Sequence, residues 1–283
     1  MKSSEVQPSP PAGAERNWTI PQRWAEYTPE QHAMWNLLYQ RQVAQLPGRV
    51  APVFLEGLDL LGMGRAGIPD FDDLSARLHR ATGWSVVTVP GLVPDAVFFE
   101  HLAQRRFVAG RFIRTPAQLD YLQEPDIFHD VFGHVPLLAH PVFADYMQAY
   151  GQGGLRALEF QAIHKLARLY WYTVEFGLIR AGDDLKIYGA GIVSSHGETQ
   201  YALDDPTPLR LRFDLRRVLR TRYKIDSFQK NYFVIDSFDD LLRQTLDTDF
   251  APLYAELAGL EDIEPSVLLA SDRRCDRGAR QSF

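Results

Sequence analysis

The spacing of apolar residues along the chain predicts mostly helices. The predicted helices lie at 29–45, at 69–82, from Pro94 onward and, as the longest, at 155–179. The second shows the helical repeat most clearly, because Leu74 and Leu78 are four residues apart and Gly83 follows its end. Shorter aliphatic and β-branched runs predict extended segments at 85–90, 111–114, 209–213 and 232–235. The predicted fold is therefore mainly α, an α+β arrangement with a minor sheet.

One compact domain is expected between two loosely packed ends. Residues 1–16 are rich in Ser, Pro, Gly and Ala and are expected to form a disordered leader. Residues 271–283 are short of core residues and are expected to form a loose tail. Because no change of composition marks a linker between them, residues 17–270 are expected to be a single domain.

Charge and cysteine content exclude several classes of protein. The 283 residues carry a net charge of −6, so no basic surface is expected for a nucleic-acid backbone. Cys275 is the only cysteine and cannot form an intramolecular disulfide, which favours a reducing compartment. No apolar run approaches the roughly 18 residues of a membrane span, and the N-terminus lacks the apolar core of a secretion signal. We therefore expect a cytoplasmic protein without nucleic-acid or membrane partners.

Two histidines lie close together in the segment 124–136. The segment begins with residues that suit a helical first turn, whereas Gly133 suits a helix end and Pro136 opposes continuation. On a continuous α-helix, His129 and His134 would point about 140° apart, given about 100° per residue. A helix break at Gly133 is therefore expected, because it would let the two imidazoles converge.

A carboxylate without basic neighbours completes a possible metal site. Glu175 lies in the longest predicted helix, and the side chains three and four residues away are all aromatic or aliphatic. A buried carboxylate needs a cation, a proton or a metal ion. Two neutral imidazoles and one carboxylate form the facial set of non-haem Fe(II) oxygenases, and the same ligands can hold catalytic zinc. His129, His134 and Glu175 are therefore candidate metal ligands.

Residue spacing alone leaves several interpretations open. The three residues would serve an Fe(II) oxygenase, a zinc-dependent hydrolase or a non-catalytic metal-binding module, and Glu175 could instead pair with a distant arginine. The HExxH spacing of zinc metalloproteases and the Gly-x-Ser-x-Gly of nucleophile-elbow hydrolases are both absent. The Gly- and Ser-rich segment 188–198 would permit a small ligand to approach the backbone closely, although it lacks the spacing of a phosphate-binding loop.

Three longer blocks resemble the pterin-dependent aromatic amino acid hydroxylases, and most closely their short bacterial members. They are PDIFHDVFGHVP at 125–136, YWYTVEFGL at 170–178 and YGAGIVSSHGE at 188–198. The likeness extends more weakly over about 18–260. It implies a single catalytic domain of this family's type. It also implies a monooxygenase that converts L-phenylalanine to L-tyrosine with O2, Fe(II) and a tetrahydropterin, tetrahydrobiopterin or a related reduced form.

The resemblance also implies roles for individual residues. It makes His129, His134 and Glu175 the iron ligands. It places the pterin at Gly91, Leu92, Val93, Phe98 and Asp130. It places the amino-acid substrate at Arg114, Pro125, Trp171, Phe176, Gly191 and Ser194. In this pattern Arg114 grips the substrate carboxylate and Ser194 supports that contact.

Two further expectations come from comparing the chain with other family members. Ile225 aligns with a position that is apolar in phenylalanine-acting relatives and acidic in tyrosine-acting ones, which implies a preference for a ring without a hydroxyl. Few residues lie outside the catalytic block, so the regulatory domain and tetramer-forming helix of animal relatives have no counterpart here. A monomer is therefore implied.

Overall fold

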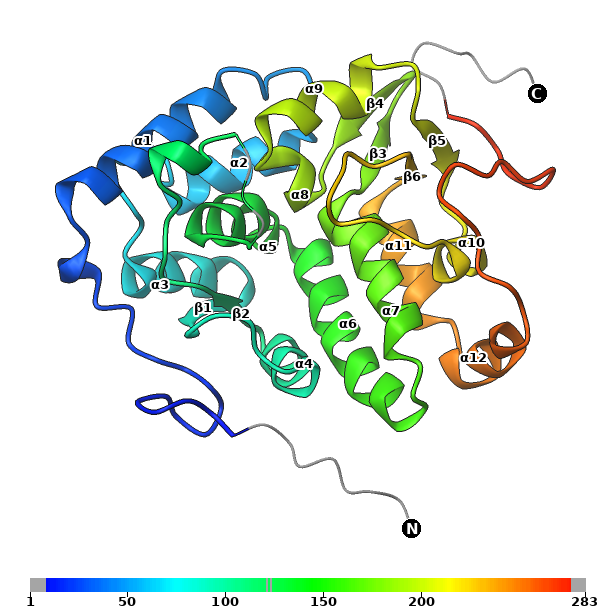
Figure 1. The fold of residues 1–283 in the computed structure, drawn as a ribbon, viewed down its shortest axis with the longest axis horizontal. Coiled ribbons are helices and arrows are strands. Elements are labelled where there is room, and N and C mark those ends of the chain that lie inside the picture. Colours follow the sequence, from blue (N-terminus) through cyan, green and yellow to red (C-terminus); the bar gives the residue numbers. More distant parts are fainter. Residues whose placement is uncertain (1–8, 121, 123, 276–283) are drawn as a thin grey trace.

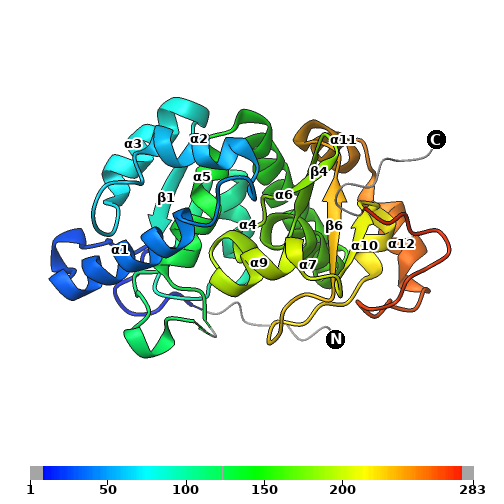
Figure 2. The same ribbon diagram turned by 90° about the horizontal axis from the view of Figure 1, so that it is seen from above.

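Two helices that lie side by side, α6 (Pro141–Glu159) and α7 (Ile163–Tyr170), form the centre of the molecule (Figure 1). The computed structural model describes residues 9–120, 122 and 124–275. Helices of the N-terminal half lie on one side of α6, and a four-stranded sheet lies on the other (Figure 2). Among the described residues, no helix has the length and apolarity needed to cross a membrane.

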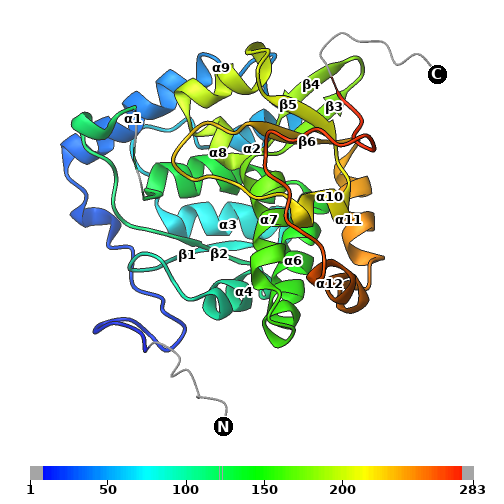
Figure 3. The same ribbon diagram turned by 45° about the vertical axis from the view of Figure 1, so that its right-hand side comes forward.

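The N-terminal half is mostly helical, as the sequence predicts. Its helices are α1 (Pro29–Val43), α2 (Pro52–Leu61), α3 (Phe71–Thr82), α4 (Asp95–Ala103) and α5 (Val135–Leu138), with 3₁₀ turns at Trp24–Glu26 and Pro116–Gln118. Thr28 forms a capping box with Gln31 at the start of α1, and the Asp70 carboxylate accepts a hydrogen bond at the start of α3. The parallel strands β1 (Ser85–Thr88) and β2 (Arg106–Ala109) lie between α3 and α4 (Figure 3).

The C-terminal half is built around a mixed sheet of order β4-β3-β6-β5. Its strands are β3 (Leu178–Ala181), β4 (Asp184–Ile187), β5 (Leu209–Arg212) and β6 (Asn231–Ile235). Its helices are α8 (Ala190–Val193), α9 (His196–Asp204), α10 (Leu215–Arg220), α11 (Phe238–Leu246) and α12 (Phe250–Ala258). Strand β6 is buried along its whole length, and α11 packs against both β6 and α6. The fold is thus mainly helical with small sheets, as expected.

The helix predicted at 155–179 is wrong, because parts of four elements occupy that stretch: the end of α6, then α7, a π-helix and the start of β3. Helix α6 begins earlier and ends at Glu159, and Gln161 then adopts a left-handed backbone with φ of 53°. After α7 the chain continues as a π-helix, η4 (Trp171–Glu175), and it enters strand β3 at Leu178. The apolar repeat continues across these junctions because each of the four elements carries buried apolar residues, so the repeat could not show where one element ends.

The helix break expected at Gly133 is also wrong. The chain forms a second π-helix, η3 (Phe128–His134), and continues directly into α5. Pro136 is accommodated because it lies in the first turn of α5, where a missing N–H is tolerated. Gly133 serves packing, since a Cβ at this position would lie 3.0 Å from the Ala190 carbonyl oxygen. Convergence of the histidines therefore comes from the wider π turn, whose hydrogen bonds join residues five apart.

Smaller differences concern the segment after β2 and the C-terminal end. Residues 111–114 lie in a loop, and the strand of this region is β2. Residues 271–275 differ from the loose tail expected there: Cys275 is buried, and its N–H donates to the Arg210 carbonyl beside β5. Residues 1–8 of the expected leader and 276–283 of the expected tail lie outside the described residues.

Candidate metal centre

Both π-helices bring their ligand-type side chains to one point. His129 and His134 come from η3, Glu175 is the last residue of η4, and both π-helices pack against α8. The two Nε2 atoms are 3.3 Å apart. Oε1 of Glu175 lies 3.2 Å from Nε2 of His134, and Oε2 lies 3.6 Å from Nε2 of His129. The structure thus brings together the three residues singled out in the sequence.

These separations fit a metal ion. With metal–ligand bonds of about 2.1 Å, adjacent ligand atoms are about 3.0 Å apart in an octahedral site and about 3.4 Å apart in a tetrahedral one. The two Nε2 atoms, 3.3 Å apart, and the separations of 3.2 and 3.6 Å between each ring and one of the two Glu175 oxygens lie close to these values. Geometry therefore supports metal binding without distinguishing iron from zinc.

The protonation state of His129 also suits a ligand. Burial lowers the pKa of His129 to about 4, so the ring is neutral near pH 7. The Ser194 hydroxyl donates its hydrogen to the Ala190 carbonyl at 2.8 Å and lies 2.9 Å from Nδ1 of His129. Because that hydroxyl has a single hydrogen, it must accept a hydrogen bond from Nδ1–H. The Nε2 lone pair of His129 is thereby left facing the metal position.

Glycines in the segment 188–198 hold Glu175 in place. A Cβ at Gly189 would lie 2.4 Å from the Glu175 carbonyl oxygen, so only glycine permits this approach. The Gly191 N–H donates a hydrogen bond to the Glu175 carboxylate. Burial opposes ionisation of Glu175, but His134 and His129 outweigh it and lower the pKa of Glu175. The glycines of this segment thus permit close packing against the end of η4, while the approach of a small ligand to this backbone stays a prediction.

A cavity of about 620 Å³ opens beside the three ligand residues. It is lined by all six residues predicted to bind substrate: Arg114, Pro125, Trp171, Phe176, Gly191 and Ser194. His129 and Glu175 also line it. The predicted substrate residues therefore share one space with two of the predicted metal ligands.

Arg114 lines the cavity, and one edge of its guanidinium is hydrogen-bonded to Asp126. Its Nε and Nη2 each lie 2.9 Å from an oxygen of Asp126, and the Asp126 carboxylate also accepts the backbone N–H of Arg114 and of His129. Arg114 lowers the pKa of Asp126 against the effect of its burial. The other edge of the guanidinium, formed by Nη1 and Nη2, has the geometry to bind a second carboxylate. Nothing in the sequence singles out Asp126, because acidic residues are common in the first turn of a helix.

Aromatic rings form the apolar side of the cavity. The Trp171 ring stacks on Tyr223 with centroids 4.3 Å apart and lies 4.7 Å from Phe176. The Trp171 indole N–H donates to the Gln229 side chain at 2.9 Å. Ile225 also lines the cavity, although its side chain is largely exposed.

A buried carboxylate on α9, that of Glu198, holds the chain segment that ends at Gln229 and Tyr232. Oε1 of Glu198 accepts hydrogen bonds from the Gln229 N–H at 3.0 Å and the Tyr232 hydroxyl at 2.7 Å. Burial raises the pKa of Glu198 to about 7. Sequence reasoning missed Glu198, Gln229 and Tyr232 as partners because they are distant in sequence and none forms a local motif.

The residues predicted to bind the pterin do not line this cavity. Gly91, Leu92 and Val93 lie in the loop between β1 and α4, and Leu92 is 81% exposed. Phe98 packs its ring edge-on against Tyr170, with centroids 5.7 Å apart. The Asp130 carboxylate accepts the Gly110 N–H at 2.8 Å, and burial raises the pKa of Asp130 to about 7.

Comparison with known proteins identifies the family. A model of the biopterin-dependent aromatic amino acid hydroxylases matches residues 16–251, most of the chain. The chain belongs to this family. The resemblance seen in the three sequence blocks is thereby confirmed, and the observed fold is that of the family's catalytic domain.

Relatives of this hydroxylase family match almost end to end. The chain is 56% identical to a phenylalanine-4-hydroxylase of Caulobacter vibrioides over 280 residues, covering 99% of this chain and 95% of that one. It is 58% identical to one from Ralstonia nicotianae, covering 94% and 85%. An iron- and phenylalanine-bound crystal structure of phenylalanine hydroxylase from Chromobacterium violaceum superposes with a TM-score of 0.88 at 51% identity, covering 94% and 96%.

Proposed function

We propose that the protein is a pterin-dependent, non-haem iron monooxygenase that hydroxylates L-phenylalanine to L-tyrosine with O2. The observation that carries the proposal is the cluster of His129, His134 and Glu175 at the wall of an aromatic-lined cavity, in a chain of the hydroxylase family. A zinc-dependent hydrolase would fit the ligand geometry equally well, but family membership favours the hydroxylase.

In this proposal His129, His134 and Glu175 would hold Fe(II) beside the cavity. When bound, Fe(II) and a reduced pterin supply the activation of O2 and the two electrons that the reaction needs. Ser194 keeps the lone pair of His129 available, and Gly191 orients the Glu175 carboxylate.

The substrate is held at both of its ends. The free edge of Arg114 binds the carboxylate, while Trp171, Phe176 and the nearby Pro125 enclose the aromatic ring. These apolar groups also keep bulk water from the reacting carbon. Arg114→Ala should therefore raise the KM for phenylalanine much more than it changes iron content. Iron loss with normal phenylalanine binding would contradict this role.

The pterin is proposed to lie against the loop of Gly91, Leu92 and Val93, with Phe98 as its stacking partner and Asp130 near its edge. The ring of Phe98 is only partly buried, and the loop is exposed, so both are accessible to a planar ligand. Phe98→Ala should raise the KM for tetrahydropterin and leave that for phenylalanine nearly unchanged. Equal changes in both would contradict the assignment.

The test of the function is product analysis. Fe(II)-loaded protein, tetrahydropterin, O2 and phenylalanine should yield tyrosine, and removal of O2 should stop the reaction. Glu175→Ala should abolish both iron binding and tyrosine formation, whereas His79→Ala, which removes an exposed histidine of α3, should change neither. Tyrosine formation that persists without O2 would contradict the monooxygenase, and the absence of phenylalanine-dependent pterin oxidation would indicate a zinc hydrolase or a non-catalytic module.

The protein is further proposed to act as a cytoplasmic monomer. The buried thiol of Cys275 as the single cysteine agrees with a reducing compartment. Light scattering coupled to gel filtration should give a mass near the 32.2 kDa of one chain. A mass of two or more chains at micromolar concentration would refute the monomer.

A further inference from the structure

A second cavity, here called the α7 cavity, lies between the start of α7 and helix α12. Its volume is about 370 Å³. Its lining residues are Phe160, Gln161, Ala162, His164, Lys165, Tyr254, Ala258, Leu260 and Asp262. None of them lines the cavity at the candidate metal centre, so the two spaces are separate.

Lys165 is the unusual residue of this cavity. Its side chain is buried, with 6% of the residue exposed, and the described part of the chain offers its ammonium no hydrogen bond or ion pair. Burial, Arg168 and Arg220 lower the pKa of Lys165, while Asp262 acts in the opposite direction. The Nζ atom keeps some solvent exposure, so the positive charge lies in the cavity without a counterion among the described residues.

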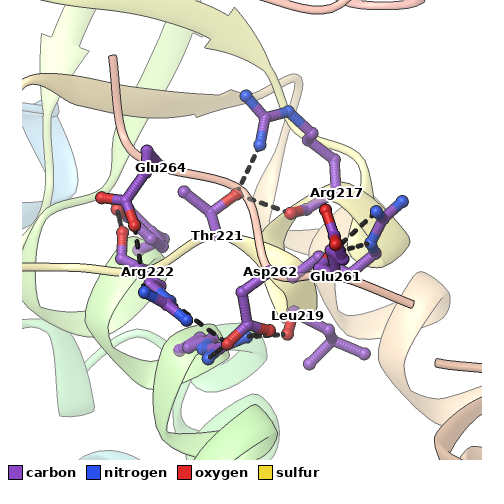
Figure 4. A network of polar contacts seen from close by, with 10 residues as sticks. Arg217, Leu219, Thr221, Arg222, Glu261, Asp262 and Glu264 are labelled. Carbon is purple, nitrogen blue, oxygen red and sulfur yellow. Dashed lines mark hydrogen bonds and ion pairs between the residues drawn. The ribbon is translucent and has the colours of Figure 1, made fainter. Parts of the chain in front are cut away.

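Asp262 does not provide that compensation. Each of its carboxylate oxygens accepts a hydrogen bond of 2.7 Å from Arg168. Arg222 makes a further contact with Asp262 at 3.4 Å, and it also pairs with Glu264 (Figure 4). The Asp262 charge is thus directed to two arginines, and Lys165 is left as excess positive charge in the cavity.

The start of α7 adds to this positive charge. The N-cap residue Ala162 has no side chain that accepts a hydrogen bond, and no acid lies in the first turn. His164 and Lys165 occupy that turn, where acidic residues usually offset the positive end of the helix dipole. An anion would satisfy both the helix end and the ammonium.

A second buried donor lines the same cavity. Tyr254 is 6% exposed, and its hydroxyl has no hydrogen-bond partner among the described residues. Burial raises the pKa of Tyr254, so the hydroxyl remains a donor at neutral pH. Phe160, half exposed and 6.3 Å from the Tyr254 ring, gives the cavity an apolar wall.

We propose that the α7 cavity binds a small oxyanion, a phosphate or a carboxylate, between Lys165, Tyr254 and the N-terminus of α7. A lone donor would not define such a site. Here three features line one space large enough for a small molecule: a lysine ammonium without a counterion among the described residues, a buried hydroxyl without a partner there, and a helix start without a side-chain cap. Phosphate and carboxylate both offer oxygen acceptors to these donors, and they differ in charge.

The test is direct binding to the iron-loaded protein at constant ionic strength, measured by calorimetry with inorganic phosphate and, separately, with acetate. Lys165→Met, which keeps the length of the side chain and removes its charge, should weaken binding at least tenfold. Tyr254→Phe should weaken it several-fold without altering the charge. Lys230→Met is the matched control, since it removes one exposed lysine away from this cavity and should leave binding unchanged.

Lys165-dependent binding of either anion supports the proposal, and the preferred anion distinguishes phosphate from carboxylate. Absence of saturable binding of both, or equal binding by Lys165→Met and Lys230→Met, overturns it. If Lys165→Met does not fold, as judged by circular dichroism, Tyr254→Phe decides: binding as tight as that of the unaltered protein would overturn the site.

Discussion

Replacing Ser194 by alanine tests the hydrogen bonds behind the proposed metal ligand His129. In the intact chain the Ser194 hydroxyl donates to Ala190 and accepts from Nδ1–H of His129 at 2.9 Å. Ser194→Ala removes that acceptor, and the ring can then carry its proton on Nε2, where it blocks the metal. We therefore expect Ser194→Ala to bind Fe(II) more weakly while the fold is retained.

The magnitude follows from the geometry. A buried donor left without an acceptor costs about 1–3 kcal/mol, and loss of a ligand-orienting partner typically weakens metal binding by about 10- to 100-fold. The latter corresponds to about 1.4–2.8 kcal/mol, so the two figures agree. Ser194→Ala should thus fall in this range, and Ser194→Thr, which keeps the hydroxyl, should recover most of the affinity.

The assay is anaerobic titration of Fe(II) against a competing chelator of known affinity. Ser195→Ala is the matched control, because Ser195 caps α9 through the Glu198 N–H and makes no contact with His129. It should lower the free energy of unfolding by about 1 kcal/mol without changing iron affinity. Iron binding by Ser194→Ala within twofold of the unaltered chain, or an equal loss in Ser195→Ala, would refute the tautomer argument.

Three further predictions concern the groups around this site. Asp126→Ala should lower the free energy of unfolding by about 3–5 kcal/mol, because it leaves the largely buried Arg114 without its partner. Denaturant titrations measure this loss, and a value below about 1 kcal/mol would contradict the role of a buried ion pair. Burial raises the pKa of Glu198 from 4.5 to about 7, so between these pH values the folded protein holds a proton that the unfolded chain releases. The free energy of unfolding therefore falls as the pH rises from 4.5 to 7, by about 3 kcal/mol at most. Unfolding titrations from pH 4.5 to 8 should show a smaller fall in Glu198→Gln, and an unchanged slope would contradict the shift. Gly189→Ala should disturb the backbone of Glu175 and reduce iron affinity, whereas Gly153→Ala, with nothing within 4 Å of its new methyl group, should not.

The sequence predicted the chemistry of the site better than its backbone. The histidines and Glu175 were found because an unpaired carboxylate in an apolar helix and two close imidazoles are uncommon, and the family blocks placed the substrate residues. The π-helices were not predicted, because their hydrogen-bond pattern leaves no separate apolar period. Asp126 and Glu198 were missed for another reason: their partners, Arg114 and Tyr232, are brought to them only by the fold.

Asp126 connects the proposed metal ligand His129 with Arg114, the proposed substrate-binding residue. Asp126 accepts the backbone N–H of His129 near the start of η3 and at the same time fixes the guanidinium of Arg114. A π-helix has poorer hydrogen bonds than an α-helix and persists where its surroundings impose it. Here the anchor that positions η3 also orients the proposed carboxylate clamp. Asp126 therefore fixes the proposed carboxylate clamp relative to His129 through hydrogen bonds to both residues.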